Sequence, residues 1–340
     1  MLKRINQILF SPLFSIGVLI LVALLFTKYY FLLTNEYYPP SFARNIADFQ
    51  ADKVFQKRFL IPFTADILSQ FAHLSFDKSL KFLTALSTFG LLHYFNHILN
   101  YFTKSLSSSY WCLIILIPIS WNYMFINSIY HAYDIPTLFF FCMCLYLFLK
   151  RRYVLFYIIF ITATFNREST CFIPVFLILV LFNFETFKDL KKSWLKNFYL
   201  TLHLFCQTII WFIVTIITRW LIEDSPGQSY ETTYSMKTFI HNMWNGAQSW
   251  PFLNTNKFFG NPRCFLTLFG CIWLAIPFLW KHIPLQSKKA LLFLPIYMIP
   301  AFMYANLMEA RVYHELNVVI ALVVTSGIIN LKHSKVNCSA

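Results

Sequence analysis

The chain has 340 residues, 58% of them hydrophobic and only 12% charged, with a formal net charge of +14. Soluble domains carry about 25% charged residues, so this composition excludes a soluble globular protein and predicts an integral membrane protein surrounded by membrane lipids. The basic residues lie mostly in short loops between apolar runs, where they report membrane orientation, so nucleic acid is not an expected partner. The eight cysteines form no CxxC pair, and neither a metal site nor a disulfide framework is predicted.

Ten mostly apolar runs follow one another along the chain, and each is a candidate for a membrane-spanning helix, which needs about 20 such residues. They cover residues 12–33, 79–101, 110–125, 129–149, 153–165, 170–184, 198–222, 263–280, 290–306 and 312–331. We therefore predict an all-α, polytopic transmembrane helical bundle of about ten spans, with residues 1–340 forming a single integral membrane domain.

Two longer polar segments separate these runs. Residues 34–78 form a first outer loop, and its partly apolar stretch 59–76 is predicted to lie at the membrane surface rather than to cross the bilayer. Residues 223–262 form a second outer loop with several Trp, Asn and Tyr residues. Both loops are candidates for substrate contacts.

The basic residues also predict an orientation. If the basic N-terminus is cytoplasmic, ten crossings bring the segments 150–152, 188–196, 281–289 and 332–335 to the cytoplasmic side. This agrees with the positive-inside rule and places nearly all acidic and mixed-charge segments at the opposite face. We expect both termini in the cytoplasm and a bacterial plasma (inner) membrane as the location, with the endoplasmic reticulum as the alternative.

The most unusual charges are those of Asn166-Arg167-Glu168-Ser169, which interrupt two apolar runs. A charge at the bilayer centre costs about 2.5–3.5 kcal/mol. These residues therefore lie near an interface or face a protein interior. One interpretation is a hairpin tip at the membrane surface whose salt bridge only fixes helix packing. The other is a polar site on which further buried charges converge.

Three arginines at the outer face border apolar runs: Arg58, Arg167 and Arg311. A guanidinium has a rigid fork of donors that fits phosphate oxygens. These residues are therefore candidates for holding the phosphate of a lipid carrier whose tail lies in the bilayer. Arg58 could instead only extend its charged end to water from a helix entry.

Acidic residues share this face. Asp48 and Asp52 on the first loop are candidates for the general base that activates an attacking hydroxyl, although their i, i+4 spacing also fits a solvated helical face. Asp134 precedes Pro136 and could be no more than a helix N-cap.

Glu168, Glu309 and Glu315 are candidates for orienting the arginines and a bound donor. Glu309 and Arg311 do not face each other within one helix, so they need partners elsewhere. An ion pair of Arg167 with Glu309 or Glu315 that serves only packing is the alternative.

These residues form four short motifs. They read Arg58-Phe59-Leu60-Ile61-Pro62, Tyr133-Asp134-Ile135-Pro136, Asn166-Arg167-Glu168-Ser169 and Glu309-Ala310-Arg311-Val312-Tyr313-His314-Glu315-Leu316. In layout and motifs the chain resembles a poorly characterised polytopic subgroup of the GT-C superfamily of membrane glycosyltransferases. The resemblance implies a GT-C-like bundle in which an acidic residue of the first outward loop lies near the transfer chemistry. The matching positions are Glu36, Asp48 and Asp52, without the adjacent acidic pair of the family.

The resemblance and the outer-face charges predict a hexosyltransferase-type enzyme that takes a sugar from a polyprenyl-phosphate-linked donor at the non-cytoplasmic face. The predicted base is Asp52 or Asp48, and the predicted substrate-binding residues are Arg58, Asp134, Asn166, Arg167, Glu168, Glu309, Arg311 and Glu315. A transporter or lipid-carrier flippase is one alternative, and it would need charges spread through the membrane depth together with broken helices. A non-enzymatic assembly protein, which would use the charges only for packing, is the other.

Overall fold

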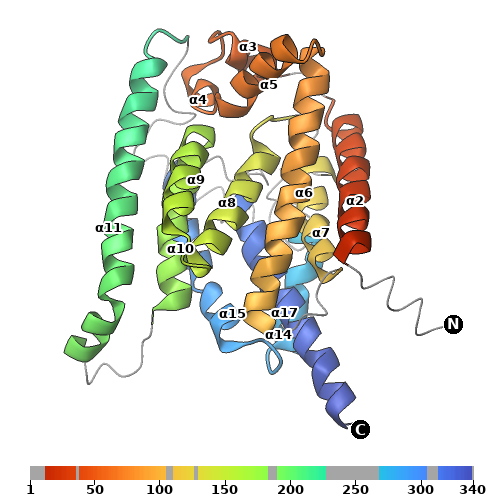
Figure 1. Cartoon of the computed structure of the whole chain (residues 1–340), viewed down its shortest axis with the longest axis vertical. Helices are drawn as coiled ribbons and strands as arrows, with labels where there is room; N and C mark the ends of the chain where they lie inside the picture. The colour runs from red at the N-terminus through yellow and green to blue at the C-terminus, as the bar shows by residue number, and fades with distance from the viewer. Residues whose placement is uncertain are drawn as a thin grey trace, which may run out of the picture.

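A computed structural model describes residues 12–35, 38–104, 110–125, 129–182, 190–226, 268–304 and 313–338. Every secondary-structure element in these ranges is a helix, which confirms the prediction of an all-α bundle. Figure 1 shows the longer helices running roughly along one axis, with a group of short helices at one end.

The helices follow the order of the predicted runs. Their bounds are α2 Pro12–Leu33, η1 Pro39–Ser41, α3 Ala43–Ala47, α4 Lys53–Gln56, α5 Leu60–Phe71, α6 Phe76–Thr103, η3 Trp111–Ile115, α7 Leu116–Ser120, η4 Trp121–Phe125, α8 Asp134–Leu149, α9 Tyr153–Asn166, η5 Glu168–Cys171, α10 Phe172–Leu181, α11 Leu190–Leu221, η7 Leu268–Ala275, α14 Ile276–Leu279, α15 Leu285–Ala290, α16 Phe293–Tyr304 and α17 His314–Cys338. Of the elements marked η, η4 is a π-helix and the others are 3₁₀-helices.

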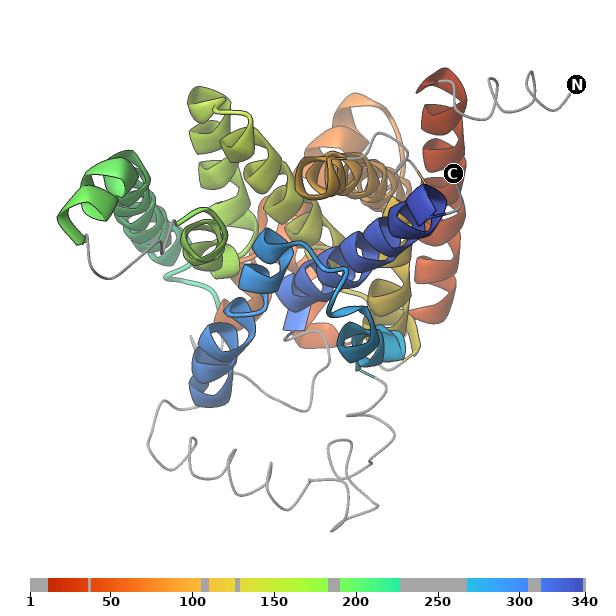
Figure 2. The ribbon, with the colours of Figure 1, turned by 90° about the horizontal axis from the view of Figure 1, so that it is seen from below.

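Three of the described helices are long and apolar enough to cross a membrane: Leu13–Leu33 in α2, Asn197–Leu221 in α11 and His314–Ser334 in α17. Their burial differs greatly, since 83% of the α17 stretch lies inside the protein but only 28% of the α2 stretch and 11% of the α11 stretch. Figure 2 accordingly shows α17 in the interior of the bundle and α2 and α11 at its edges.

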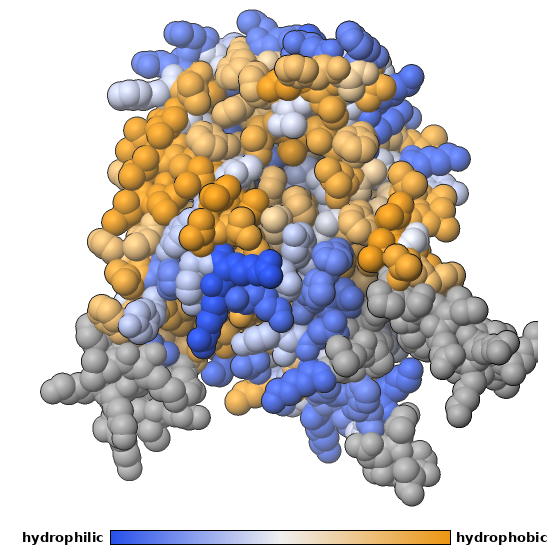
Figure 3. Space-filling view, viewed as in Figure 1, coloured by the Kyte–Doolittle hydropathy of each residue, from blue (hydrophilic) through white to orange (hydrophobic). Residues whose placement is uncertain are grey.

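The surface between the two ends of the molecule is apolar. On α11 the exposed side chains include Phe205, Phe212 and Trp220. Figure 3 shows a broad band of hydrophobic residues between hydrophilic residues at both ends. An exposed apolar surface of this size and shape matches the hydrocarbon interior of a bilayer, so the structure supports association with a membrane.

The segment predicted to be the first outer loop contains α3, α4 and α5, which lie together at one end of the bundle (Figure 1). In α5, Ile61 and Ala65 are buried in a small cluster with Leu80 of α6, while Phe63 and Phe71 are exposed. The helix therefore has two apolar faces, one packed on the bundle and one exposed, and it occupies most of the segment predicted to lie at the membrane surface.

Two predicted spans are not continuous α-helices. In the span predicted at 110–125, the backbone passes from the 3₁₀-helix η3 through α7 to the π-helix η4. In η7, Phe269, Gly270 and Cys271 all have left-handed backbone conformations. A Cβ atom on Gly270 would lie 2.8 Å from Cγ2 of Ile117, so glycine allows the two irregular segments to pack closely.

The span predicted to begin at residue 129 is also shorter than expected, because α8 begins only at Asp134. Pro136 lies in the first turn of this helix, where a proline is tolerated since its missing N–H would have no partner in the helix. The late start leaves His131 and Tyr133 outside the helix, beside the candidate site.

Candidate functional site

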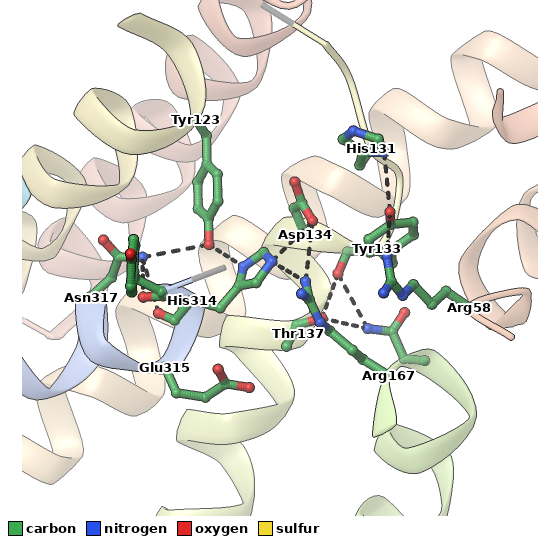
Figure 4. A network of polar contacts seen from close by, with 12 residues as sticks. Arg58, Tyr123, His131, Tyr133, Asp134, Thr137, Arg167, His314, Glu315 and Asn317 are labelled. Atoms are coloured by element: carbon green, nitrogen blue, oxygen red, sulfur yellow. Dashed lines mark hydrogen bonds and ion pairs between the residues drawn. The ribbon is translucent and has the colours of Figure 1, made fainter. Parts of the chain in front are cut away.

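A buried polar cluster is built around Asp134, whose side chain is 1% exposed. Asp134 lies in the first turn of α8, where the helix dipole favours a carboxylate. The N-cap position is taken by Tyr133, so the interpretation of Asp134 as the cap is wrong. Figure 4 shows the carboxylate directed at Arg167 and His314.

Arg167 connects the tip of the α9–α10 hairpin to this carboxylate. Its extended backbone, with φ −164° and ψ 135°, separates the end of α9 from η5. Its Nη1 lies 3.5 Å from Oδ1 of Asp134, and its side chain is only 12% exposed. Removing one partner of a buried ion pair costs about 3–5 kcal/mol, because the other charge stays buried. The tip is therefore more than a surface turn.

His314, the first residue of α17, is fully buried and joins three groups. Its Nε2 lies 3.3 Å from Oδ1 of Asp134, the same oxygen that faces Arg167. Arg167 Nη1 also hydrogen-bonds to this Nε2, and Nδ1 hydrogen-bonds to the hydroxyl of Tyr123. Because a guanidinium can only donate, Nε2 accepts, which puts the imidazole proton on Nδ1 and leaves the ring neutral.

Tyr133 extends the cluster toward α4. Nη1 of Arg58 donates a 2.8 Å hydrogen bond to the Tyr133 hydroxyl, and the Arg58 guanidinium lies 4.8 Å from the centre of the ring. The Arg167 guanidinium lies 5.8 Å from the same ring. Cation–π contacts within about 6 Å are attractive. One tyrosine therefore brings together two arginines that are distant in sequence, and Arg58 does more than extend its charge to water.

Next to Arg58, Lys57 forms an ion pair with Glu168, with Nζ 3.3 Å from Oε1. Burial alone would raise the pKa of Glu168, but the charges of Lys57, Arg58 and Arg167 outweigh it and hold the pKa below its usual range. Trp211 of α11 donates a 2.7 Å hydrogen bond to the backbone carbonyl of Glu168. The tip is thus tied to both α4 and α11.

Asn166 ties the tip to the start of α8. Its Nδ2 donates to the backbone carbonyl of Tyr133 at 3.2 Å and to Oγ1 of Thr137 at 2.9 Å. Glu315, the second acid buried here, accepts a 2.5 Å hydrogen bond from Tyr297 of α16. The ion pair of Arg167 is therefore made with Asp134, whereas the partner found for Glu315 is a tyrosine.

The two candidate bases lie in different surroundings. Asp48 is exposed and pairs at 3.0 Å with Arg44, which also reaches Asp66 of α5 at 2.7 Å. Because Asp48 is the C-cap of α3, it does not share one helical face with Asp52, and the interpretation of a shared helical face is wrong. Asp52 is half-buried and is the N-cap of α4, without a side-chain hydrogen bond to the helix. Lys57 is the C-cap of the same helix, so Asp52 lies about 7.5 Å along the axis from a member of the cluster.

Glu36, Glu309 and Arg311 lie outside the described residues. The contribution of Glu309 and Arg311 to the cluster therefore stays a prediction.

Sequence reasoning missed the aromatic members of the cluster. Tyr123 and Tyr297 lie in runs that count as apolar, so nothing in the pattern marked them, and Tyr133, although part of the motif with Asp134, was assigned no role. His314 was part of a quoted motif beside Glu315, and its polarity at the start of an apolar run was the available signal. Lys57 was marked only by being adjacent to Arg58.

The cluster suits an anionic ligand. Among the described residues, three cationic side chains, Lys57, Arg58 and Arg167, gather beside three carboxylates, Asp134, Glu168 and Glu315. These charges balance, so it is the planar donor forks of the two arginines that favour a phosphate or carboxylate ligand.

Comparison with known proteins identifies no relative. The chain matches no protein family, and no curated protein and no solved structure is significantly similar to it. The function is therefore argued from the cluster itself.

Proposed function

We propose that this chain is an integral membrane glycosyltransferase that moves a sugar from a polyprenyl-phosphate-linked donor to a hydroxyl group. The observation that carries the proposal is the convergence of Arg58 and Arg167 on Tyr133, with Lys57 paired to Glu168 beside them and Asp52 at the other end of α4. A departing phosphate is stabilised by cations, and an attacking hydroxyl needs a base. The cations of the cluster would meet the first requirement, and Asp52, at the opposite end of α4 from Lys57, is proposed to meet the second.

The proposed membrane arrangement is GT-C-like. Helices α2, α11 and α17 cross the bilayer, and the shorter apolar helices complete about ten crossings. Both termini are cytoplasmic, in a bacterial plasma membrane, and the end that carries α3, α4 and α5 is non-cytoplasmic. The turns between α8 and α9 and between α14 and α15 are basic in sequence. In Figure 1 they lie farther from the end of the bundle that carries α3, α4 and α5. This distribution supports the orientation.

In the proposed reaction Asp52 accepts the proton of the attacking hydroxyl, whose oxygen forms a bond to the anomeric carbon of the sugar. The bond between that carbon and the phosphate oxygen breaks, and the polyprenyl phosphate leaves with the electron pair. Arg58 and Arg167 hold the phosphate through their donor forks, and Lys57 adds positive charge.

The remaining residues position these groups. Asp134 and Glu168 hold the cations through the ion pairs described above, while Asn166 fixes the tip. Glu315 keeps the start of α17 in place through Tyr297. Glu309 and Arg311 are proposed to complete the substrate site.

The test compares Asp52→Asn with Asp48→Asn in membranes supplied with short-chain polyprenyl-phosphate hexoses. Loss of a general base typically lowers the rate about 10²–10⁴-fold, so Asp52→Asn should lose transfer while its melting temperature in detergent is kept. Asp48→Asn is the matched control, because Asp48 belongs to the surface pair with Arg44. Full activity in both variants would remove the first loop from the mechanism. Lost folding in both would favour the non-enzymatic assembly protein.

The phosphate holders are tested by Arg167→Lys and Arg58→Lys. Lysine keeps the charge but loses the planar fork, so both variants should bind the lipid-phosphate donor more weakly than the native chain. Arg44→Lys changes a surface arginine and serves as the control. Equal binding of the lipid-phosphate donor by all three variants would refute the assignment of Arg58 and Arg167 as phosphate holders.

A transporter or lipid-carrier flippase is the second candidate, and the irregular segments favour it. Asn122 in the π-helix η4 accepts a 3.2 Å hydrogen bond from the backbone N–H of Phe269 in η7, so two broken helices meet in the core. Transporters use such breaks at their binding sites. Movement of a labelled lipid-linked sugar across proteoliposomes, without sugar transfer, would select this function.

A further inference from the structure

One oxygen of Asp134 lies close to two neighbours, Arg167 and His314. Oδ1 lies 3.5 Å from Nη1 of Arg167 and 3.3 Å from Nε2 of His314. The same two nitrogens also contact each other, with Arg167 donating to His314. Figure 4 shows the three side chains meeting at one point. While Nε2 of His314 accepts from Arg167, it has no proton to donate, so only the guanidinium can donate a hydrogen bond to that oxygen.

In this arrangement Arg167 supplies the positive charge beside Asp134, and its donor-only guanidinium assigns a neutral ring to His314. The Nδ1 proton of His314 is directed at Tyr123, and Nε2 is used as an acceptor. Asp134 is 1% exposed and His314 is fully buried. A carboxylate in such surroundings needs a nearby positive charge, because an uncompensated buried charge costs several kcal/mol.

An anion that draws the Arg167 guanidinium toward itself changes this balance. It takes away the positive charge that faces Asp134 and also vacates Nε2 of His314. That nitrogen can then bind a proton and donate a hydrogen bond to Oδ1 of Asp134, which lies within reach without any movement of α17. The imidazolium replaces the guanidinium as the counter-charge.

We propose that an anion binds at Arg167 together with a proton, which is taken up by His314 to neutralise Asp134. This inference rests on the proposed role of Arg167 as a phosphate holder and adds proton linkage to the same site. Its consequence is that affinity for the anion rises as the pH falls, by up to about tenfold per pH unit for one linked proton.

Several other ionisable groups face the same place and are alternative proton acceptors. Tyr123 of η4 bonds to His314, and Glu315 of α17 bonds to Tyr297 of α16. Tyr30 of α2 lies within electrostatic reach of Asp134 and Tyr123. The proton is assigned to His314 because its Nε2 lies against both Arg167 and Asp134.

The experiment measures sulfate binding to the full chain in detergent by titration calorimetry, over about pH 5 to 9, the range in which histidines titrate. Sulfate keeps a constant charge in this range, and buffers with different heats of ionisation give the number of protons taken up. The native chain should take up protons on binding, approaching about one per sulfate. His314→Gln should bind sulfate without proton uptake, whereas His93→Gln, a change in the half-buried histidine of α6, should behave as the native chain.

Each contrary outcome has a separate meaning. Sulfate binding by the native chain without proton uptake would overturn the inference and leave the phosphate-holding role of Arg167 intact. Equal sulfate affinity in Arg167→Lys would instead refute that role. If His314→Gln does not fold, Asp134→Asn provides the same test, because a neutral amide needs no counter-charge. Proton uptake that persists in either variant would overturn the assignment of the proton to His314.

Discussion

Asn122 and Asn317 are 195 positions apart in sequence, and Nδ2 of Asn122 donates a 2.8 Å hydrogen bond to Oδ1 of Asn317 in the fully buried core. The bond joins the π-helix η4 to the central helix α17. Asn317 in turn donates to the hydroxyl of Tyr123, which bonds to His314. The irregular segment and the candidate site are therefore parts of one hydrogen-bonded network.

Replacing Asn317 by Leu leaves the buried amide of Asn122 without this acceptor. We expect a loss of about 1–3 kcal/mol in the free energy of unfolding, seen as a lower melting temperature in detergent. The double variant Asn122→Leu, Asn317→Leu should lose less than the sum of the single changes, with a coupling of about 0.5–3 kcal/mol. If the losses of the two single variants simply add up in the double variant, a direct hydrogen bond between Asn122 and Asn317 would be contradicted. Asn45→Leu, which removes an exposed hydrogen bond to the carbonyl of Pro39, provides the control.

Gly270 and Gly17 form a matched pair for testing the irregular segment η7. Gly270 has φ +63° and close contact with Ile117, whereas a Cβ on Gly17 would meet nothing within 4 Å. Gly270→Ala should cost about 1–2 kcal/mol or more, because a left-handed conformation is unfavourable for alanine. Gly17→Ala should cost nothing, since Gly17 lies inside the helix α2. Equal melting temperatures for the two variants would argue against the left-handed turn.

The lowered pKa of Glu168 predicts a pH dependence of stability. Because the folded-state pKa lies below the unfolded value of about 4.3, the ion pairs of Glu168 stabilise the fold fully above that value. Their contribution is lost as the pH falls through the folded-state pKa. The melting temperature of Glu168→Gln should therefore lie below that of the native chain at neutral pH and approach it at acid pH. Glu223→Gln, at an exposed position, should show no such convergence.

The proposed orientation is tested with single cysteines in a background without reactive native cysteines. A membrane-impermeant thiol reagent added to intact cells should label Asp48→Cys in the first outer loop. It should label Lys150→Cys, in the exposed turn after α8, only after permeabilisation. The reverse pattern would invert the orientation, and labelling of both in intact cells would contradict the ten-span arrangement.

Continuous helices were predictable, and broken ones were not. The run predicted at 12–33 has the same bounds as α2, and the run at 153–165 ends one residue before α9 does. Both follow from apolar composition with polar residues at the ends. The breaks in η4 and η7 depend on the contact of Gly270 with Ile117 and on the bond from Phe269 to Asn122, which join distant parts of the chain. Hydropathy carries no information about such contacts.

The same distinction applies to the candidate site. Asp134 and Arg167 could be found because a charge in an apolar run is costly and therefore informative. Tyr133 could not, although both arginines pack against its ring, because tyrosine counts as apolar in a membrane segment. The different surroundings of Asp48 and Asp52 could not be predicted either, since they depend on how α3 and α4 fold over the bundle.

The exposed helix α11 has a consequence for the response of this protein to its surroundings. Its 32 residues extend about 48 Å, whereas the hydrocarbon core of a bilayer is about 30 Å thick, so an α11 that crosses the bilayer as proposed would tilt or project from it. The hydrogen bond from Trp211 attaches this helix to the Glu168 tip. In that arrangement, hydrophobic mismatch that changes the tilt of α11 would act on Glu168, which pairs with Lys57 and directly follows Arg167. Bilayer thickness would then be a variable that can tune the candidate site.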